Sequence, residues 1–205
     1  MNLTLQATDL SKDFNRRKIF SGISFTLSLP ASLAITGKNG SGKSTLAKVI
    51  ARVLSPTTGT VAYQADGIVL PEEKCRTHVG FVSPYLNLYD EFSATENLFL
   101  LMRIRPAKSP DTTLTESLLK QFNLWHRRDD LVRGYSTGMK QRLKYVFALS
   151  HAPSILILDE PTTNLDDDGI KVVEDVVSRQ KESSILVVAT NDSAEAAWCE
   201  KKISL

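Results

Sequence analysis

The stretch that decides the fold of this chain reads Gly37-Lys38-Asn39-Gly40-Ser41-Gly42-Lys43-Ser44-Thr45, with the phosphate-binding form Gly-x-x-x-x-Gly-Lys-Ser. Apolar residues at 33–36 predict a short buried strand before it. Apolar residues at helical spacing predict a helix from Leu46 to Leu54 after it. Strand, loop and helix in this order are the context that the motif requires. The sequence therefore predicts an α/β protein with a phosphate site at the end of that strand.

The glycines of this loop explain how it can hold an anion. Without a Cβ atom, Gly37, Gly40 and Gly42 let the chain turn tightly and bring its N–H groups close to a phosphate. Those groups form a concave anion site, and the helix N-terminus adds partial positive charge. We expect Lys43 to reach the β- and γ-phosphates and the Ser44 hydroxyl to bind Mg²⁺.

Length and composition favour a single soluble domain. The 205 residues suffice for one sizeable α/β core with an inserted subdomain. The net charge of +2 and the absence of a basic stripe predict no nucleic-acid partner. Cys75 and Cys199 lack metal-like spacing and fit a reducing compartment. The N-terminus does not read as a signal peptide, and no apolar run approaches the ~20 residues of a membrane span.

Strand patterns occur before and after the middle third of the chain. Residues 3–10 alternate loosely and predict an edge strand, followed by a polar turn at 12–17. The apolar run at 155–158 predicts a parallel strand that is covered on both faces, and the run at 185–190 predicts the next core strand. Further strands are expected at 19–29, 60–63, 68–70 and 79–82, the last three within a small antiparallel layer.

Helical patterns dominate residues 85–150. We expect this region to be a helical subdomain inserted into a P-loop core with a mostly parallel sheet and an N-terminal antiparallel β layer. Residues 1–84 and 151–205 would form that core, so that 1–205 is one nucleotide-binding domain.

Three helices are expected within the insert. The capping boxes at 93–96 and 113–116 predict two helix starts, with a proline-containing loop at 105–111 between them. A third helix is expected from Met139 to about Ser150.

A pair of acidic residues gives the second chemical signal. Asp159 and Glu160 directly follow the apolar run at 155–158. A carboxylate at the carboxyl end of a parallel strand beside a phosphate-binding loop can bind Mg²⁺. The neighbouring carboxylate can accept a proton from an attacking water. The alternative is a strand end with two solvated acids; the phosphate-binding loop favours the metal and base assignment.

Together these motifs resemble the ATP-binding cassette (ABC) ATPases over essentially the whole chain. The glycine loop looks like Walker A, and 155–160 looks like Walker B with its catalytic glutamate, Glu160. Residues 135–139 stand where the family has its signature, and 163–166 match the D-loop. Phe14 stands where the family has the aromatic residue that stacks on adenine. The resemblance implies Mg²⁺ at Ser44 and Asp159. It implies ATP at Phe14, Gly37, Lys38, Asn39, Gly40, Ser41, Gly42, Lys43, Ser44, Thr45, Ser136, Gly138 and Asn191.

The signature segment implies a dimer. Ser136 is a good helix N-cap, and Gly138 lets a phosphate approach closely. In the family, the signature of one subunit covers the nucleotide on the Walker A motif of the other. The resemblance therefore implies a head-to-tail homodimer with two nucleotides between two subunits. Thr137 and Met139 depart from the usual signature, and the resulting Tyr-Ser-x-Gly-Met form of this chain resembles that of exporter-type ATPases.

Two further departures bear on hydrolysis. Pro84 stands where the family usually has a glutamine that touches Mg²⁺, and Asn191 stands where it has a histidine. Proline offers no donor, and asparagine can hydrogen-bond a phosphate but cannot carry charge. The resemblance implies an ATPase subunit that drives a separate membrane-spanning subunit. The alternative is a slow or non-hydrolysing ATP-dependent dimerisation switch.

The resemblance also implies a partner and a location. Tyr85–Phe92 would lie beside the groove that receives an integral membrane permease; the alternative is that these residues pack the insert onto the core. A subunit of this kind sits peripherally on the cytoplasmic face of the inner membrane. The run at 19–27 resembles the haem-exporter ATPase of cytochrome c maturation. A ribosome- or DNA-associated ABC protein is less compatible with 205 residues.

Overall fold

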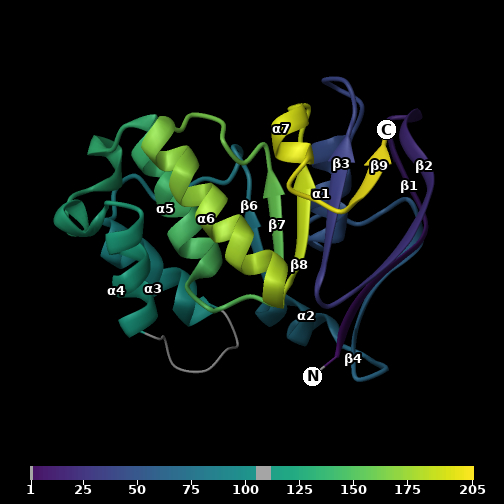
Figure 1. Cartoon of the computed structure of the whole chain (residues 1–205), viewed down its shortest axis with the longest axis horizontal. Coiled ribbons are helices and arrows are strands. Elements are labelled where there is room, and N and C mark those ends of the chain that lie inside the picture. The colour runs from purple at the N-terminus through teal and green to yellow at the C-terminus, as the bar shows by residue number, and fades with distance from the viewer. Residues whose placement is uncertain (1, 105–111) are drawn as a thin grey trace.

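The computed structural model describes residues 2–104 and 112–205 and contains two sheets. The antiparallel sheet has the order β2-β1-β4-β5 and the parallel sheet the order β6-β7-β8-β3-β9 (Figure 1). The antiparallel strands are β1 (Leu3–Phe14), β2 (Arg17–Ser28), β4 (Thr58–Ala65) and β5 (Ile68–Val69). The parallel strands are β3 (Ala31–Thr36), β6 (Val79–Val82), β7 (Ile155–Asp159), β8 (Ile185–Ala189) and β9 (Lys201–Ser204).

Strand β1 is not an edge strand, so the expectation for residues 3–10 is wrong. It pairs with β2 on one side and with β4 on the other, and it continues to Phe14. Its alternation reflects burial of one face, with Leu3 and Leu5 inside, and that pattern is the same for interior and edge strands of an antiparallel sheet. The expected turn at 12–17 shrinks to Asn15 and Arg16, both with positive φ.

Strand β6 also departs from the expectation. It belongs to the parallel sheet, where Val79 pairs with Ile155 and Val82 with Leu158, and not to the antiparallel layer. Its four residues carry too little pattern to indicate the partner strand. This placement puts the residue after β6 beside the residue that ends β7.

The helices in the first half of the chain begin and end at points set by local chemistry. Helix α1 (Lys43–Ile50) starts before the expected Leu46. It also stops before the expected Leu54, because the backbone of Arg52 has a positive φ and cannot continue the helix. Helix α2 (Glu72–His78) was not expected, although acidic residues in its first turn and basic residues in its last suit the helix dipole.

The two capping boxes have different outcomes. Helix α3 (Ala94–Ile104) confirms the first box, since Ser93 Oγ accepts from Glu96 N at 3.1 Å and Glu96 Oε2 from Ser93 N at 2.7 Å. The second is wrong, because Thr113 lies inside α4 (Thr112–Gln121). The expected loop at 105–111 lies outside the described residues.

Of the remaining helices, α5 (Thr137–Leu149) confirms the one expected from Met139 to about Ser150, while the short ones were not expected. Short 3₁₀ helices η1 (Trp125–Arg127) and η2 (Val132–Gly134) lead to α5. The chain ends with α6 (Asp167–Ser183) and the one-turn α7 (Ser193–Ala196) before β9. In the described ranges, no helix is both long enough and apolar enough to cross a membrane.

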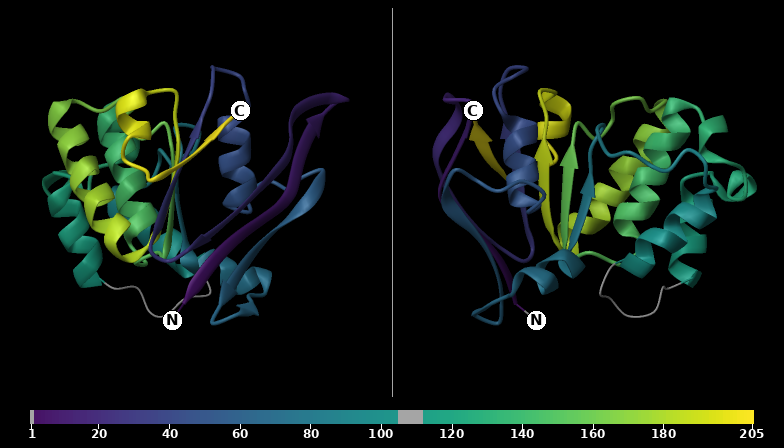
Figure 2. Two further views of the ribbon diagram at one scale, coloured as in Figure 1. Left: turned by 45° about the vertical axis from the view of Figure 1, so that its right-hand side comes forward. Right: turned by 180° about the vertical axis from the view of Figure 1, so that it is seen from behind.

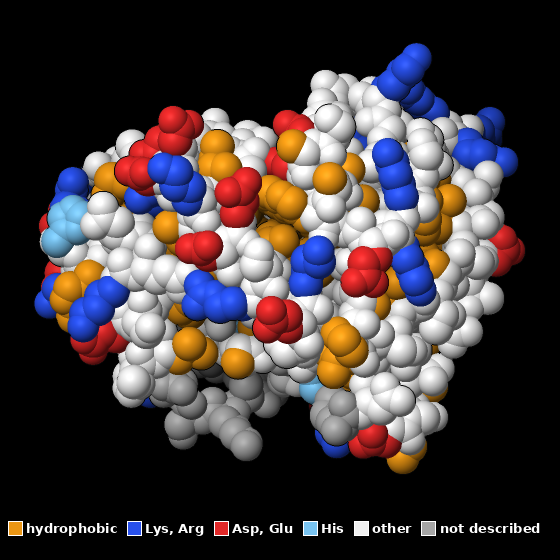
Figure 3. Space-filling view, in the orientation of Figure 1, with side chains coloured by type: hydrophobic (Ala, Val, Ile, Leu, Met, Phe, Trp, Pro, Cys, Tyr) orange, Lys and Arg blue, Asp and Glu red, His pale blue; other side chains and the backbone are white. Residues whose placement is uncertain are grey.

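The core has two parts, one on each side of the parallel sheet. Helix α1 lies between the two sheets, where its Leu46 and Ile50 pack in one cluster with Leu5 and Tyr63 (Figure 2). Helices α3 to α6 lie on the other side, and their cluster includes Phe122 stacked on Tyr145. On the face in Figure 3, acidic and basic side chains are interspersed.

Candidate functional site

The phosphate-binding loop connects β3, which is buried throughout, to α1. Gly37 has a φ of 149° and Gly42 a φ of 106°, values that residues with a side chain rarely adopt. A Cβ at Gly42 would lie 2.5 Å from Ile19 Cγ2, and one at Gly37 would lie 2.7 Å from Leu205 O. Both glycines are therefore required by backbone conformation and by space.

The loop keeps a buried ammonium at its centre. Lys43 is 5% exposed, and its Nζ donates to Gly37 O at 3.0 Å and to Lys38 O at 3.1 Å. Ser41 Oγ is buried and has no hydrogen-bond partner in the described part of the chain. A buried hydroxyl without a partner, such as that of Ser41, costs free energy that a ligand could recover. The Lys43 ammonium can give up its hydrogen bonds to the two neutral carbonyls and form stronger ones to an anion. The loop is thus suited to a phosphate group.

A buried carboxylate lies beside the loop. Asp159 ends β7 and is 1% exposed; its Oδ1 accepts from Ser44 Oγ at 2.8 Å and its Oδ2 from Ser83 Oγ at 3.1 Å. Burial raises the pKa of Asp159, and the bonds from Ser44 and Ser83 oppose that shift. Hydroxyl and carboxylate oxygens are ligands that Mg²⁺ prefers, so this group fits that metal.

Ser83 is a residue that the sequence reasoning missed. It follows β6 directly and is 1% exposed. A single serine at a strand end has no motif, and only the register of β6 against β7 places it next to Asp159. The available signal was a small polar residue between apolar Val82 and Pro84.

Glu160 lies in a hollow of about 510 Å³ next to the loop. Its φ is 49°, its backbone N–H donates to Ala189 O at 2.9 Å, and its side chain is partly exposed. The left-handed turn after β7 places the two adjacent carboxylates differently, with Asp159 buried and Glu160 on the hollow. The lining residues are Phe14, Ile19, Asn39, Gly40, Gly42, Lys43, Ser44, Thr45, Tyr85 and Glu160.

Asn191 lies next to the loop as well. It follows β8 closely, and its Nδ2 donates to Asn39 Oδ1 at 2.9 Å. The preceding Thr190 is 1% exposed and donates through Oγ1 to Glu195, which also accepts from Thr162 N at 3.1 Å. These bonds hold the end of β8 beside the end of β7, which fixes the backbone that carries Asn191.

The structure does not bring the signature residues to this hollow. Ser136 is exposed and caps α5, with its Oγ accepting from Met139 N at 3.2 Å, which confirms its expected capping. Neither Ser136 nor Gly138 is among the residues that line the hollow. Within one chain, therefore, the signature and the phosphate-binding loop are separate.

The stretch Tyr85–Phe92 divides between two environments. Tyr85 lines the hollow beside the loop, and Lys48 Nζ lies 4.9 Å from the centre of its ring. Leu88 packs against the helical cluster. Tyr89 and Phe92 are exposed, with ring centres 5.5 Å apart. Tyr85, at 69% exposure, is thus at least as open to solvent as Tyr89 and Phe92, whereas Leu88 is turned toward the helical cluster.

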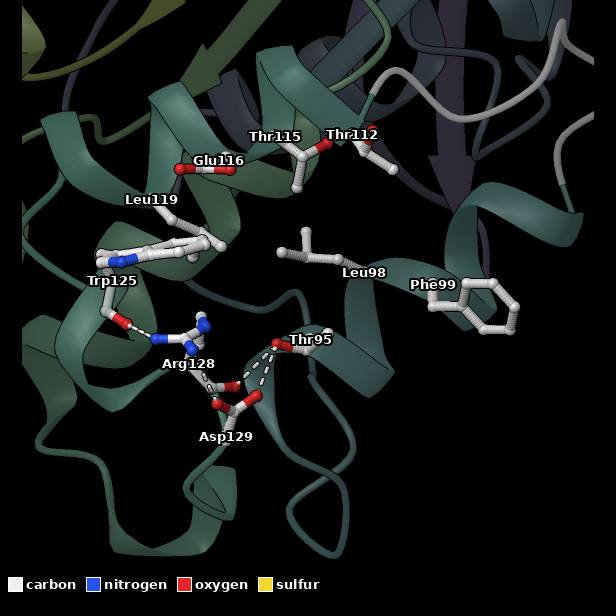
Figure 4. A pocket seen from close by; sticks show the side chains of 10 residues that line it. All are labelled: Thr95, Leu98, Phe99, Thr112, Thr115, Glu116, Leu119, Trp125, Arg128 and Asp129. Carbon is white, nitrogen blue, oxygen red and sulfur yellow. Dashed lines mark hydrogen bonds and ion pairs between the residues drawn. The ribbon is translucent and has the colours of Figure 1, made fainter.

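A second hollow lies among α3, α4 and η1, away from these residues (Figure 4). Its volume is about 250 Å³, and Leu98, Leu119 and Trp125 give it an apolar interior. Arg128 lies over the Trp125 ring, with its Cζ 4.1 Å from the ring centre. The exposed Phe99 lies at one side of this hollow. None of the residues expected to bind nucleotide or metal lines it.

A glycine loop between a parallel strand and a helix, with a buried carboxylate at the end of a neighbouring strand, defines a P-loop nucleotide-binding protein. Comparison with known families identifies it further. The family model described as ABC transporter matches residues 20–163. The chain belongs to that family, as the ATP-binding and ATP-hydrolysing subunit of an ABC transporter.

Relatives cover the full length of the chain. The lipoprotein-releasing system ATP-binding protein LolD of Hydrogenovibrio crunogenus is 33% identical, over all of this chain and 94% of the relative. The dimeric structure of MJ0796, a bacterial ABC transporter cassette, superposes with a TM-score of 0.85 at 25% identity, covering 98% of this chain and 94% of that one. An ATP-binding subunit of an ABC transporter gives the same TM-score at 26% identity, covering 98% and 85%.

Proposed function

We propose that ATP binds with Mg²⁺ in the hollow beside the phosphate-binding loop and is hydrolysed there. The hydrogen bond between Ser44 Oγ and Asp159 Oδ1 carries this proposal, because it places a hydroxyl and a buried carboxylate together at the N-terminus of α1. Ser44 and Asp159 would hold the metal, directly or through water. Bound Mg²⁺ neutralises charge on the phosphates and fixes their orientation.

Several residues on the hollow, together with Asn191 beside the loop, then have roles in nucleotide binding and hydrolysis. The amides of the loop and Lys43 bind the phosphates, and Phe14, 44% exposed at the rim, stacks on the base. Glu160 accepts a proton from the attacking water, since it lines the hollow and is partly exposed, whereas Asp159 is buried on Ser44 and Ser83. Asn191, held on Asn39, donates to the terminal phosphate.

We propose that the active form is a head-to-tail homodimer. Ser136 is exposed at the N-terminus of α5 and away from the hollow, so it can contact a phosphate only on a second subunit. The amides at the start of that helix suit an anion. ATP would close the dimer, and hydrolysis would open it.

The dimer would drive a separate integral membrane subunit. Within Tyr85–Phe92 the rings of Tyr85, Tyr89 and Phe92 are exposed, and Phe99 on α3 is 54% exposed. Exposed aromatic residues close together suit a protein partner. We place the membrane subunit there and the ATPase peripherally on the cytoplasmic face of the membrane. Residues 85–150 would move as the unit that connects the two. The narrower resemblance to the haem-exporter ATPase stays a prediction.

The experiment compares the wild type with Glu160→Gln, with exposed Glu174→Gln on α6 as the matched control. Steady-state Mg²⁺-ATPase activity and ATP-dependent dimerisation by size-exclusion chromatography are measured. We expect Glu160→Gln to lose turnover by about 10²- to 10⁴-fold while retaining ATP in a dimer, and Glu174→Gln to match the wild type. Full activity in Glu160→Gln would overturn the assignment of the base.

The same experiment addresses the dimerisation switch considered from the sequence. Membership of the ABC transporter family does not favour that alternative. It would regain support only from a wild type that binds ATP and forms a stable dimer without measurable turnover.

A further inference from the structure

A chain of buried bonds connects α5, the helix that Ser136 caps, to the carboxylate of Asp159. Ser83 and Lys144 form the intermediate links, and both are buried, at 1% and 8% exposure. Neither residue belongs to a motif recognised in the sequence. The bonds run from Lys144 to the backbone after β6, and from the Ser83 side chain to Asp159.

The carboxylate of Asp159 is held on both sides. Ser44 donates to one oxygen at 2.8 Å and Ser83 to the other at 3.1 Å. If Ser44 turns its oxygen to Mg²⁺, the first bond is lost or redirected. Ser83 then remains as the side-chain donor that fixes the rotation of the carboxylate. Groups that orient a metal ligand in this way alter metal affinity about 10- to 100-fold.

The position of Ser83 depends in turn on Lys144. The Nζ of Lys144 donates to Pro84 O at 2.7 Å and to Ser83 O at 3.3 Å. The ion pairs of the described residues do not include Lys144. Burial, together with nearby Lys140, lowers the pKa of the Lys144 ammonium.

In the described part of the chain, the hydrogen bonds of Lys144 go to neutral carbonyls, and a buried cation bonded in this way contributes little to stability because its desolvation is poorly offset. An apolar side chain of the same length would fit the fold at least as well. The geometry therefore suggests that Lys144 serves to fix the backbone of Ser83 and Pro84, and not to hold α5 against β6.

We propose that Ser83 is a positioning residue of the Mg²⁺ site and that Lys144 acts through it, so that the orientation of Asp159 is coupled to helix α5. This inference rests on the proposed Mg²⁺ site. The segment after β6 contacts the metal ligand through the serine hydroxyl, although Pro84 itself has no donor. Movement of α5 on dimerisation would then be transmitted to the metal.

The test measures metal binding directly. Mn²⁺, used as the probe in place of Mg²⁺, is titrated into the purified chain with ADP and followed by electron paramagnetic resonance. We expect Ser83→Ala to weaken Mn²⁺ binding about tenfold and Lys144→Met severalfold, with metal-free ADP binding unchanged. Ser150→Ala, which removes another buried hydroxyl, and Lys140→Met on the same helix are the matched controls and should bind Mn²⁺ as the wild type does.

The double variant of Ser83→Ala and Lys144→Met separates coupling from independent effects. If Lys144 acts through Ser83, the double variant binds Mn²⁺ no more weakly than Ser83→Ala alone. Equal Mn²⁺ affinity in Ser83→Ala and the wild type, or effects that multiply in the double variant, would overturn the inference. Thermal unfolding of each variant is recorded, and Lys144→Met, expected to unfold like the wild type, keeps the test valid if Ser83→Ala does not fold.

The variant Asp159→Asn separates failure of this inference from failure of the proposed Mg²⁺ site on which it rests. If that variant binds Mn²⁺ as well as the wild type, the Mg²⁺ site itself is misplaced. If Asp159→Asn loses Mn²⁺ while Ser83→Ala keeps it, the metal site stands and only the positioning role of Ser83 fails.

Discussion

Asn191 Nδ2 lies 2.9 Å from Asn39 Oδ1 and donates a hydrogen bond to it, joining the end of β8 to the phosphate-binding loop. Both side chains are exposed, so the bond can be exchanged for one to a phosphate oxygen. This contact brings a neutral donor to the position that, by the resemblance noted in the sequence, the ABC ATPases usually fill with a histidine.

We predict that Asn191→Ala lowers the ATPase rate about tenfold or more, because a hydrogen bond to a charged phosphate is lost. Asn191→His should hydrolyse ATP at or above the wild-type rate, since the imidazole also donates and can carry charge. Steady-state kinetics with Mg²⁺-ATP give both values, with Asn87→Ala as the control. Unchanged kinetics in Asn191→Ala would show that this residue does not contact the terminal phosphate.

Phe14 provides a second prediction. Its ring is 44% exposed at the rim of the nucleotide hollow, and Lys12 Nζ lies 4.9 Å from the ring centre. Stacking of a base on an aromatic ring contributes about 1–3 kcal/mol, so Phe14→Ala should weaken ATP binding by about 5- to 150-fold. Phe14→Tyr should restore it. Fluorescence titration with a labelled nucleotide measures the affinity, and Phe99→Ala on α3, where the ring is 54% exposed, is the control. If both alanine variants bind ATP alike, the base lies elsewhere.

The success of the sequence reasoning depended on how local each signal was. The phosphate-binding role of the loop at 37–45 was predictable because it depends on consecutive residues. The roles of Asp159 and Glu160 were predictable for the same reason. Ser83 was not, because its role depends on the register of β6 against β7, which no local pattern encodes. The wrong capping box at Thr113 shows the converse: the spacing of a true cap also occurs inside a helix.

The contact between β6 and α5 gives a stability prediction. A Cβ added at Gly80 would lie 2.5 Å from Ala148 O and 2.9 Å from Pro153 Cγ, so Gly80→Ala forces the strand and helix apart. Overpacking of this kind costs about 1–3 kcal/mol in the free energy of unfolding. Gly134→Ala is the control, because nothing lies within 4 Å of its Cβ. Urea unfolding compares the two; equal stability would mean that β6 can shift without cost.

Tyr135 gives the last prediction, and it concerns pH. The residue precedes Ser136, is 6% exposed, and donates through its hydroxyl to Arg127 O at 2.6 Å. Burial, with a smaller effect of the Asp130 charge, raises the pKa of the Tyr135 phenol from 10.0 to about 12. The unfolded chain therefore loses this proton near pH 10, whereas the folded chain keeps it until about pH 12.

Between those two values unfolding releases a proton, so a rising pH favours the unfolded state. The contribution of Tyr135 is fully present below about pH 10 and is lost as the pH approaches 12. Tyr135→Phe should be less stable than the wild type by about 1 kcal/mol at neutral pH, because one buried hydrogen bond is removed. The difference should narrow in urea unfolding at about pH 11 relative to about pH 8. Other groups that titrate in this pH range are the same in both proteins, so their effects cancel in the comparison. A stability difference that stays constant with pH would mean that the Tyr135 phenol ionises alike in the folded and unfolded chains.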